Sequence, residues 1–290
     1  MQNYVIVTDS TSDLPLEIIE QYEITVLPLQ FSIGGRSYLN YPDERDYPLA
    51  AFYQNLRDQM EAKTSQVSYG CYQESFEDIL SSGRDILYIG FSSALSGTYS
   101  AACLAADDLL PRYPGRNILL VDSLCASLGE GLLVYRLAQM RKAGSSLEEV
   151  YRWAMENRGS ICHWFTVDDL GCLKRGGRIS ATAAFLGTAL QIKPVLHVDD
   201  AGRLIPMEKV RGRAHALTAL VDEMEKTAVN PQEQVVFISH GDCLQDAQTV
   251  ARMVQERLGV PKVVINYVGP VIGSHSGPGT VALFFFGKHR

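Results

Sequence analysis

Residues 86–106 read ILYIGFSSALSGTYSAACLAA, and the rest of the chain can be placed around this stretch. The apolar residues 86–91 predict a short buried strand, and the small residues 99–106 predict a helix. The hydroxyl-rich turn between them, residues 92–98, lies where a helix leaves its first backbone N–H groups unpaired. Such a turn can hold an anion, although Ser and Thr also serve simply as N-caps that bind no ligand.

The composition is that of an ordinary globular protein. The chain has 290 residues, of which 46% are hydrophobic, and a formal net charge of −7. This length favours two domains, and the acidic balance argues against nucleic acid or an anionic membrane surface as the main partner. No apolar run approaches the roughly 20 residues of a membrane span, so we expect no membrane insertion.

The cysteines and the start of the chain bear on the cellular compartment. The six cysteines are scattered, with no C-x-x-C pair, and the chain enters a strand without an export segment. We therefore expect reduced thiols in a cytoplasmic protein.

The first half alternates strands and helices, which predicts an α/β domain built on a parallel sheet. The expected strands are residues 4–8, 25–29, 86–91 and 117–121, and the expected helices are residues 16–22, 49–60, 69–80, 99–110, 126–143 and 147–157. Residues 30–39 predict a hairpin, and residues 63–68 predict a polar loop. Ligands of such sheets bind at the carboxyl ends of the strands, where Asp9, Ser93 and Asp122 are expected.

The pattern changes near Ser160 to a mixed α/β arrangement. The expected strands are residues 161–167, 193–198, 203–210, 235–239, 263–268 and 280–286, and the expected helices are residues 168–173, 180–190, 213–227 and 244–258. We therefore divide the chain into an N-terminal domain of residues 1–160 and a C-terminal domain of residues 161–290. The helix at 180–190 is rich in Ala and Gly, which suits either close helix packing or the close approach of a thin ligand.

His275 is the least ordinary residue of the second half. It lies in residues 269–279, whose four glycines and two prolines predict an irregular loop that presents the imidazole to a ligand. An acyl hydrolase would use Ser93 or Ser96 as nucleophile, His275 as base and Asp9 as the group that orients the base.

The common catalytic motifs are absent. The sequence has no G-x-S-x-G elbow, P-loop lysine motif, H-E-x-x-H or dinucleotide G-x-G-x-x-G after the first strand. A further alternative is a phosphometabolite-binding protein that uses Lys174, Arg175 and Arg178 of the basic loop 174–178, although this loop is equally suited to be a solvated surface.

Seven motifs occur in order along the chain: residues 9–14 (DSTSDL), 64–66 (TSQ), 92–99 (SSALSGTY), 173–180 (LKRGGRIS), 193–194 (KP), 239–242 (SHGD) and 273–279 (GSHSGPG). Together they resemble the DegV family and span nearly the whole chain. The resemblance implies a bacterial fatty-acid-binding protein with two α/β domains, a long-chain acid such as palmitate or oleate in a tunnel between them, and no other cofactor. Some members of this family present the acid to a separate fatty-acid kinase, which phosphorylates the carboxylate to an acyl phosphate.

The same resemblance, carried over position by position, implies a set of site residues. The hydroxyls of Thr64 and Ser93 are expected to hold the carboxylate, and Arg175 is expected to meet the kinase or its phosphate. Val67 departs from the family, which usually has proline there. The other residues expected around the carboxylate are Ser65, Ser96, Gly97, Thr98, His275 and Ser276. No metal or nucleic acid is expected.

The energetics of burial support separate roles for the acyl tail and the carboxylate. Burial of an acyl chain contributes about 0.8 kcal/mol per methylene, so about 14 methylenes contribute roughly 11 kcal/mol before the costs of association. The tail then provides the affinity, and hydroxyl and backbone N–H groups need only position the carboxylate.

Overall fold

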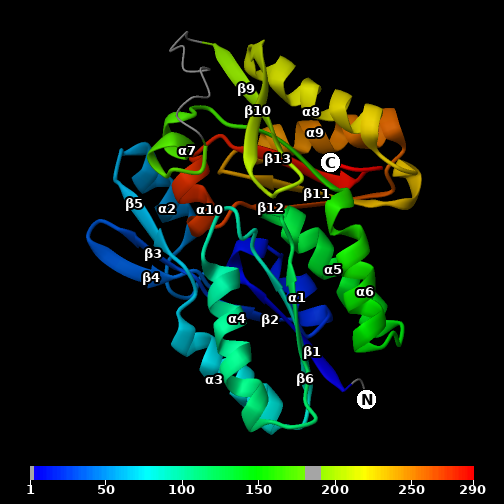
Figure 1. Cartoon of the computed structure of the whole chain (residues 1–290). Coiled ribbons are helices and arrows are strands. Elements are labelled where there is room, and N and C mark those ends of the chain that lie inside the picture. The colour runs from blue at the N-terminus through cyan, green and yellow to red at the C-terminus, as the bar shows by residue number, and fades with distance from the viewer. Residues whose placement is uncertain (1–2, 180–190) are drawn as a thin grey trace.

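The structure, a computed structural model, describes residues 3–179 and 191–290. It contains a four-stranded parallel sheet, a six-stranded mixed sheet and a small three-stranded antiparallel sheet (Figure 1). The parallel sheet has the order β2-β1-β6-β7, which confirms the fold predicted for the first half. Its strands are β1 (Tyr4–Asp9), β2 (Thr25–Leu27), β6 (Asp85–Gly90) and β7 (Ile118–Asp122).

The parallel sheet is buried on both faces, as its near-continuous apolar strands require. Successive side chains of a strand point to opposite faces, so Tyr4 and Ile6 enter one hydrophobic cluster and Val5 and Val7 enter another. The helices of this half are α1 (Leu16–Gln21), α2 (Leu49–Arg57), α3 (Tyr69–Ser81), α4 (Thr98–Leu109), α5 (Leu128–Lys142) and α6 (Leu147–Asn157).

The six-stranded sheet has the order β10-β9-β8-β13-β11-β12, and only its β11–β12 pair is parallel. The second half therefore has the mixed sheet that its sequence predicts. Its strands are β8 (Ile161–Thr166), β9 (Ile192–Val198), β10 (Leu204–Arg211), β11 (Val235–His240), β12 (Lys262–Tyr267) and β13 (Val281–Phe286), and its helices are α7 (Gly171–Arg175), α8 (Arg213–Thr227), α9 (Leu244–Leu258) and α10 (Pro270–Ser276). The short 3-10 turns are η1 (Ser10–Ser12), η2 (Leu110–Arg112), η3 (Arg158–Ser160) and η4 (Pro231–Glu233).

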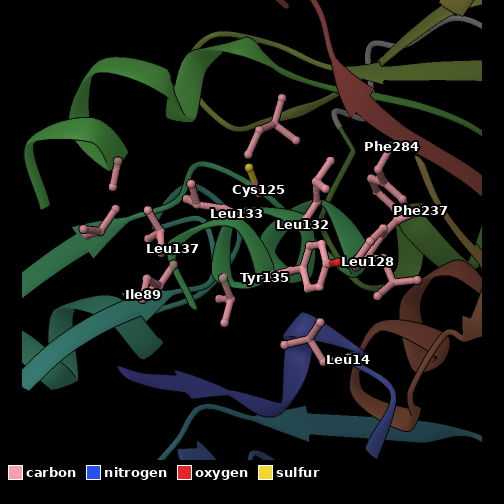
Figure 2. Packing of buried hydrophobic residues seen from close by; sticks show 14 of the residues in the cluster. Leu14, Ile89, Cys125, Leu128, Leu132, Leu133, Tyr135, Leu137, Phe237 and Phe284 are labelled. Carbon is pink, nitrogen blue, oxygen red and sulfur yellow. The ribbon is translucent and has the colours of Figure 1, made fainter. Parts of the chain in front are cut away.

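Helices α8 and α9 cover one face of this sheet, and α5 packs against the other face and against the parallel sheet. Because α5 lies between two sheets, most of its residues are buried, including the charged Glu130 and Arg141. Figure 2 shows Leu132 and Tyr135 of α5 beside Phe237 of β11, with the Tyr135 and Phe237 ring centroids 5.4 Å apart. The two halves thus share one continuous core, and the proposed division at residue 160 coincides with the start of β8.

Residues 63–68 differ from the polar loop predicted for them. Strand β5 (Ala62–Ser65) pairs antiparallel with β3 (Gln30–Ile33), which also pairs with β4 (Arg36–Leu39). The prediction was wrong because β5 is an edge strand of alternating exposure, held by backbone pairing rather than by an apolar run. The register places Thr64 opposite Phe31 and so fixes the position of the Thr64 hydroxyl.

The segment around His275 also differs from the expected irregular loop. Pro270–Ser276 forms the helix α10, which begins with a proline in the first position and ends at Gly277, whose φ is 79°. The fixed φ of proline suits the first turn, and glycine accepts the left-handed conformation after the last turn. Gly273 also allows close packing, because a Cβ there would lie 2.8 Å from the Tyr53 hydroxyl. The glycines and prolines therefore shape a tightly packed helix.

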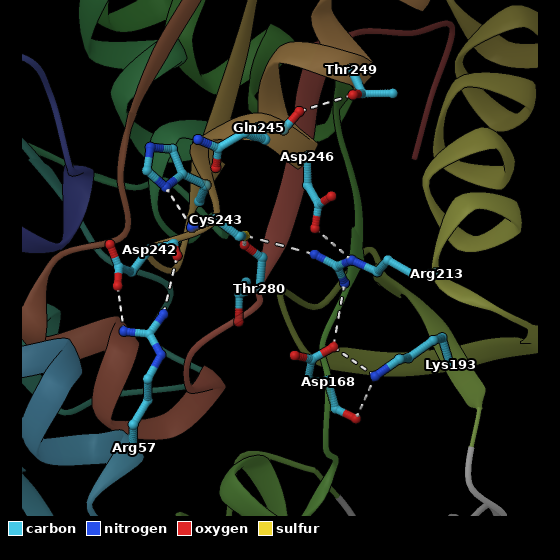
Figure 3. Close-up of polar contacts among 11 residues, drawn as sticks. Arg57, Asp168, Lys193, Arg213, Asp242, Cys243, Gln245, Asp246, Thr249 and Thr280 are labelled. Atoms are coloured by element: carbon cyan, nitrogen blue, oxygen red, sulfur yellow. Dashed lines mark hydrogen bonds and ion pairs between the residues drawn. The ribbon is translucent and has the colours of Figure 1, made fainter.

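Three ion pairs link separate elements of the chain (Figure 3). Asp168 accepts from Lys193 Nζ at 2.6 Å, and Asp246 Oδ2 accepts from Arg213 Nε at 2.8 Å. Arg57 of α2 (Leu49–Arg57) pairs with Asp242, which follows β11. Such half-exposed pairs contribute little stability each, but the last one joins the two halves of the chain. The helix expected at 180–190, and with it Gly187, lies outside the described residues.

Candidate ligand-binding site

A cavity of about 290 Å³ lies between the parallel sheet and the six-stranded sheet, near the lower end of the range for small-molecule sites, roughly 300–1,000 Å³. Most of its wall is apolar, and every element of that wall belongs to one of the two sheets or to a segment joining them. The apolar lining consists of Leu29, Phe91, Leu95, Ala126, Phe165, Leu173, Val198, Leu204, Val268, Val271, Ile272, Ala282 and Phe284.

The alternation of side chains along two strands explains the apolar wall. Phe165 of β8 and the pair Ala282 and Phe284 of β13 face the cavity, whereas their neighbours Trp164 and Leu283 pack under α8 and α9. Both strands are apolar on both faces, so their sequences predict burial without showing which face borders a cavity.

One end of the cavity is polar, and its central contact joins residues from the two halves. The Thr64 hydroxyl oxygen on β5 lies 2.9 Å from His275 Nε2 on α10. Burial, together with the positive charge of Arg178, lowers the pKa of His275 to about 4. The imidazole is therefore neutral at pH 7, and one of its nitrogens can donate a hydrogen bond while the other accepts.

Two serines add hydroxyls at this polar end. Ser96 Oγ donates to Thr98 Oγ1 at 3.0 Å and accepts from the Thr98 amide at 3.2 Å. Ser276 lies at the end of α10, and its buried hydroxyl has no hydrogen-bond partner within residues 3–179 and 191–290. A buried hydroxyl without a partner is costly unless a ligand or water completes it. Ser276 is therefore a ready contact for a polar group in the cavity.

The residues expected from the sequence separate into two groups. Those that line the cavity are Thr64, Ser65, Ser96, Gly97, His275 and Ser276. Thr98 is fully buried and reaches the cavity only through Ser96, and Ser93 is exposed, with its amide donating to Asp122 Oδ1 at 3.2 Å. Arg175 lies in an adjoining groove rather than in the cavity.

Several lining residues were not identified as site residues from the sequence. Arg178 was assigned only to a phosphate-binding alternative, yet it lines the cavity and donates from Nε to the Leu95 carbonyl at 3.2 Å. Gln66 is held against Gly97, where a Cβ would lie 2.3 Å from Gln66 Oε1. The basic loop 174–178 was a usable signal for Arg178, whereas nothing near Gln66 in the sequence marks it beyond its place in the Thr-Ser-Gln motif.

Further polar groups line the interior of the cavity but are engaged with the protein. His163 Nδ1 pairs with the Ile161 carbonyl at 3.0 Å, and its Nε2 accepts from the Ala126 amide at 3.3 Å. Burial lowers the pKa of His163 well below its usual value, so this ring is neutral. Ser127 and Ser239 bond to each other at 2.9 Å. These groups are satisfied without a ligand and can border an apolar chain.

An adjoining groove of about 900 Å³ shares Thr64, Arg178 and His275 with the cavity. Arg175 lines this groove and donates from Nη2 to Cys172 Sγ at 3.1 Å. The polar end of the cavity therefore borders a broad, partly cationic groove.

Sequence comparison identifies the relatives of this chain. The family model described as "Uncharacterised protein, DegV family" matches residues 3–288. A DegV domain-containing protein from Clostridium perfringens (strain 13 / Type A) is 48% identical over 290 residues, which cover 100% of this chain and 99% of that protein. The chain belongs to the DegV family.

Solved structures of other proteins have the same fold. A DegV family protein from Thermus thermophilus, described by its fatty-acid binding, is 30% identical with a TM-score of 0.87 over 99% of this chain and 100% of that chain. A stearic-acid-binding protein from Eubacterium ventriosum is 26% identical with a TM-score of 0.88 over 98% of each chain.

A serine-hydrolase relay is not formed within the part of this DegV chain that the structure describes. Ser96 pairs with Thr98 and His275 with Thr64. Asp9 is buried at the end of β1, where it accepts from the Phe91 amide at 3.1 Å. The same residues, 3–179 and 191–290, hold no group of three or more His, Cys, Asp or Glu side chains placed to bind a metal. None of their helices is both long and apolar enough to cross a bilayer.

Proposed function

We propose that this protein binds one long-chain fatty acid, such as palmitate or oleate, and acts as a carrier rather than an enzyme. The observation that carries this proposal is the cavity between the sheets, whose wall is apolar and whose one end presents hydroxyls, an imidazole and a guanidinium. Fatty-acid binding by the DegV family protein from Thermus thermophilus and stearic-acid binding by the protein from Eubacterium ventriosum support it.

The carboxylate is placed in this proposal at Thr64, His275 and Ser276. A buried carboxylate needs several donors and a compensating charge. The Thr64–His275 pair can donate one hydrogen bond while its own contact holds, the Ser276 hydroxyl can donate a second, and Arg178 lines the same end of the cavity. Ser65, Ser96 and Gly97 complete this end, with Thr98 positioning the Ser96 hydroxyl. For Ser93 we propose a contact only if the turn before α4 rearranges on binding.

The acid is proposed to extend along the apolar wall toward Phe165 and Phe284. The rings of such a wall exclude water, and each buried methylene contributes about 0.8 kcal/mol. The satisfied groups at His163 and Ser127 do not compete for the chain, because each already has protein partners. Affinity then depends on the length of the tail, and position depends on the carboxylate.

Mass spectrometry of the purified protein tests the proposal. Under denaturing conditions, an organic extract is expected to contain about one long-chain fatty acid per chain, and Ala126→Leu, which adds bulk at the cavity wall, is expected to lower that ratio. Ala50→Leu on the exposed side of α2 is the matched control and should retain the acid. A blank extract, with no uptake of added palmitate or oleate by the natural chain, would reject the carrier proposal.

We further propose that the carboxylate is presented to a fatty-acid kinase across the adjoining groove. The groove borders the Thr64–His275 contact, and Arg175 lines it at a position suited to a phosphate or to an acidic partner surface. Arg175→Ala is expected to leave palmitate binding unchanged and to slow acyl-phosphate formation in a reconstituted reaction. If Arg175→Ala supports the same rate as the natural chain, Arg175 has no role in the transfer.

A further inference from the structure

A second cavity, of about 200 Å³, lies beside the turn that follows β1. Its walls come from this turn and the start of α1, from the connection between β4 and α2, and from the segment that joins β12 to α10. The two cavities share no lining residue, although Pro270, which starts α10, borders the second one. The second cavity therefore needs an account of its own, independent of fatty-acid binding.

The charged groups around the second cavity are all acidic. Among its described lining residues there is no Lys, Arg or His. Glu17 and Glu44 contribute carboxylates, and Asp13 contributes a carboxyl group that is mostly neutral at pH 7, because burial raises its pKa to about 8. Asp13 Oδ1 accepts from the Gly269 amide at 3.0 Å, and Glu44 Oε2 accepts from the Leu49 amide at 2.9 Å. Glu17 is exposed at the first turn of α1 and makes no such bond within the described residues.

The second cavity also has uncharged groups that lack partners. Ser12 is only 1% exposed and lines the cavity, yet its hydroxyl has no hydrogen-bond partner among residues 3–179 and 191–290. A ligand in the cavity would give this hydroxyl a partner.

Two asparagines leave acceptor oxygens free at the same cavity. Asn40 Nδ2 donates to the Ser10 carbonyl at 3.3 Å, and Asn266 Nδ2 donates to the Asp13 carbonyl at 2.8 Å. Carbonyl oxygens only accept, so these contacts fix which end of each amide is NH₂. Each Oδ1 is then an acceptor without a partner in the described part of the chain. The cavity is thus richer in acceptors than in donors.

Aromatic rings complete the wall. Phe31, Tyr41, Tyr47 and Tyr267 all line the cavity. The guanidinium carbon of Arg45 lies 4.2 Å from the centroid of the Tyr41 ring, so a ring of this wall already attracts a cation from outside. Carboxylates, unpaired acceptors and aromatic faces all favour the same class of ligand, a cation that donates hydrogen bonds.

We propose that the second cavity binds a small organic ammonium ion, the protonated form of a primary amine. An ammonium group has three donors and no acceptor, which matches the free oxygens of Ser12, Asn40 and Asn266. The second cavity is smaller than the acyl cavity, about 200 against 290 Å³, so the proposed ligand is a short alkylammonium or the head of a longer amine that extends to solvent. The proposal does not rest on fatty-acid binding.

Isothermal titration calorimetry with n-propylammonium chloride tests this proposal on the full chain. Saturable binding is expected, and n-propanol, which has the same shape without the charge, should bind far more weakly. Sodium chloride at the same ionic strength controls for screening. Absence of saturable binding, or equal binding of n-propanol, would overturn the proposal.

Two glutamates of α1 form a matched pair for the same experiment. Glu17 lines the cavity, and Glu20 is an exposed carboxylate on the same helix outside the lining. Glu17→Gln is expected to weaken binding about two- to fivefold, as for the loss of an exposed charge pair. Glu20→Gln should bind as the natural chain does. An equal loss in both variants would show a general effect of net charge and reject the site.

Ser12→Ala tests the buried end of the second cavity. It is expected to weaken n-propylammonium binding while thermal unfolding and palmitate binding stay as in the natural chain, because no hydrogen bond of the Ser12 hydroxyl within the described protein is lost. Unchanged n-propylammonium affinity in a folded Ser12→Ala variant would contradict the assigned contact.

Discussion

Replacement of Thr64 by Val is the sharpest test of how the proposed site holds a carboxylate. Valine keeps the β-branched shape that suits the edge strand β5 and removes only the hydroxyl, whose oxygen lies 2.9 Å from His275 Nε2. The proposal gives this hydroxyl a hydrogen bond to the bound carboxylate. Such charged hydrogen bonds contribute about 1.5–3 kcal/mol. Palmitate affinity is therefore expected to fall about 10- to 150-fold.

The assay is displacement of a fluorescent fatty acid, carried out in parallel with palmitate and hexadecanol. The alcohol has the same tail without the charged group, so Thr64→Val should weaken hexadecanol binding much less than palmitate binding. Ser93→Ala is the control variant, because Ser93 is exposed and lies outside the cavity lining. It is expected to leave both affinities unchanged.

Two results would refute this reasoning. An equal loss for palmitate and hexadecanol would show that Thr64 shapes the cavity without contacting the carboxylate. A loss confined to palmitate in Ser93→Ala would place the Ser93 hydroxyl on the carboxylate and would require the turn before α4 to move when the ligand binds.

Three other substitutions test separate parts of the structure. Gly176→Ala places a Cβ 2.2 Å from His275 Nδ1, so the ring must move, and palmitate affinity should fall about tenfold, as for one lost hydrogen bond to a charged group; unchanged affinity contradicts the position of this ring. Burial raises the pKa of Asp13 to about 8, so its neutral form stabilises the fold and that contribution is lost as the pH rises from about 4 to about 8. The free energy of unfolding, measured with urea, should therefore depend less on pH between about 4 and 8 in Asp13→Asn than in the natural chain. The same dependence in both proteins would contradict this prediction. Ser146 Oγ accepts from the Glu149 amide at 3.2 Å in the capping box of α6, so Ser146→Ala should lower the free energy of unfolding by about 1 kcal/mol and leave palmitate binding intact; a change in palmitate affinity would show that α6 is coupled to the cavity.

The buried strands and long helices could be predicted from the sequence because their signals are local. The run at β6 is apolar over its whole length, and the Ser146–Glu149 pattern opens α6 as expected. Strand β5 and helix α10 could not be predicted in this way. The residues of β5 are polar because the strand lies at an edge, and α10 is rich in Gly and Pro because it packs closely against Tyr53.

The candidate site was predicted in residue types but not in arrangement. The hydroxyls of Thr64 and Ser96 and the imidazole of His275 stand out in the sequence by their turns and motifs. Their sequence positions do not show that Thr64 and His275 touch, since 211 residues separate them. Ser93 and Ser96 lie three residues apart in one turn, yet only Ser96 lines the cavity. The direction of each side chain in that turn depends on contacts such as the one between the Ser93 amide and Asp122.

The sequence by itself determined the family, the α/β class and the groups available to hold a carboxylate, because hydrophobic periodicity, turns and motifs are properties of short segments. Tertiary structure alone decided which of these groups share a cavity, that Arg178 borders its polar end, and that Ser12 faces a second, acidic cavity. Such contacts arise where two sheets and the segments between them pack together. Their geometry depends on the packing of the whole chain and leaves no local pattern in the sequence.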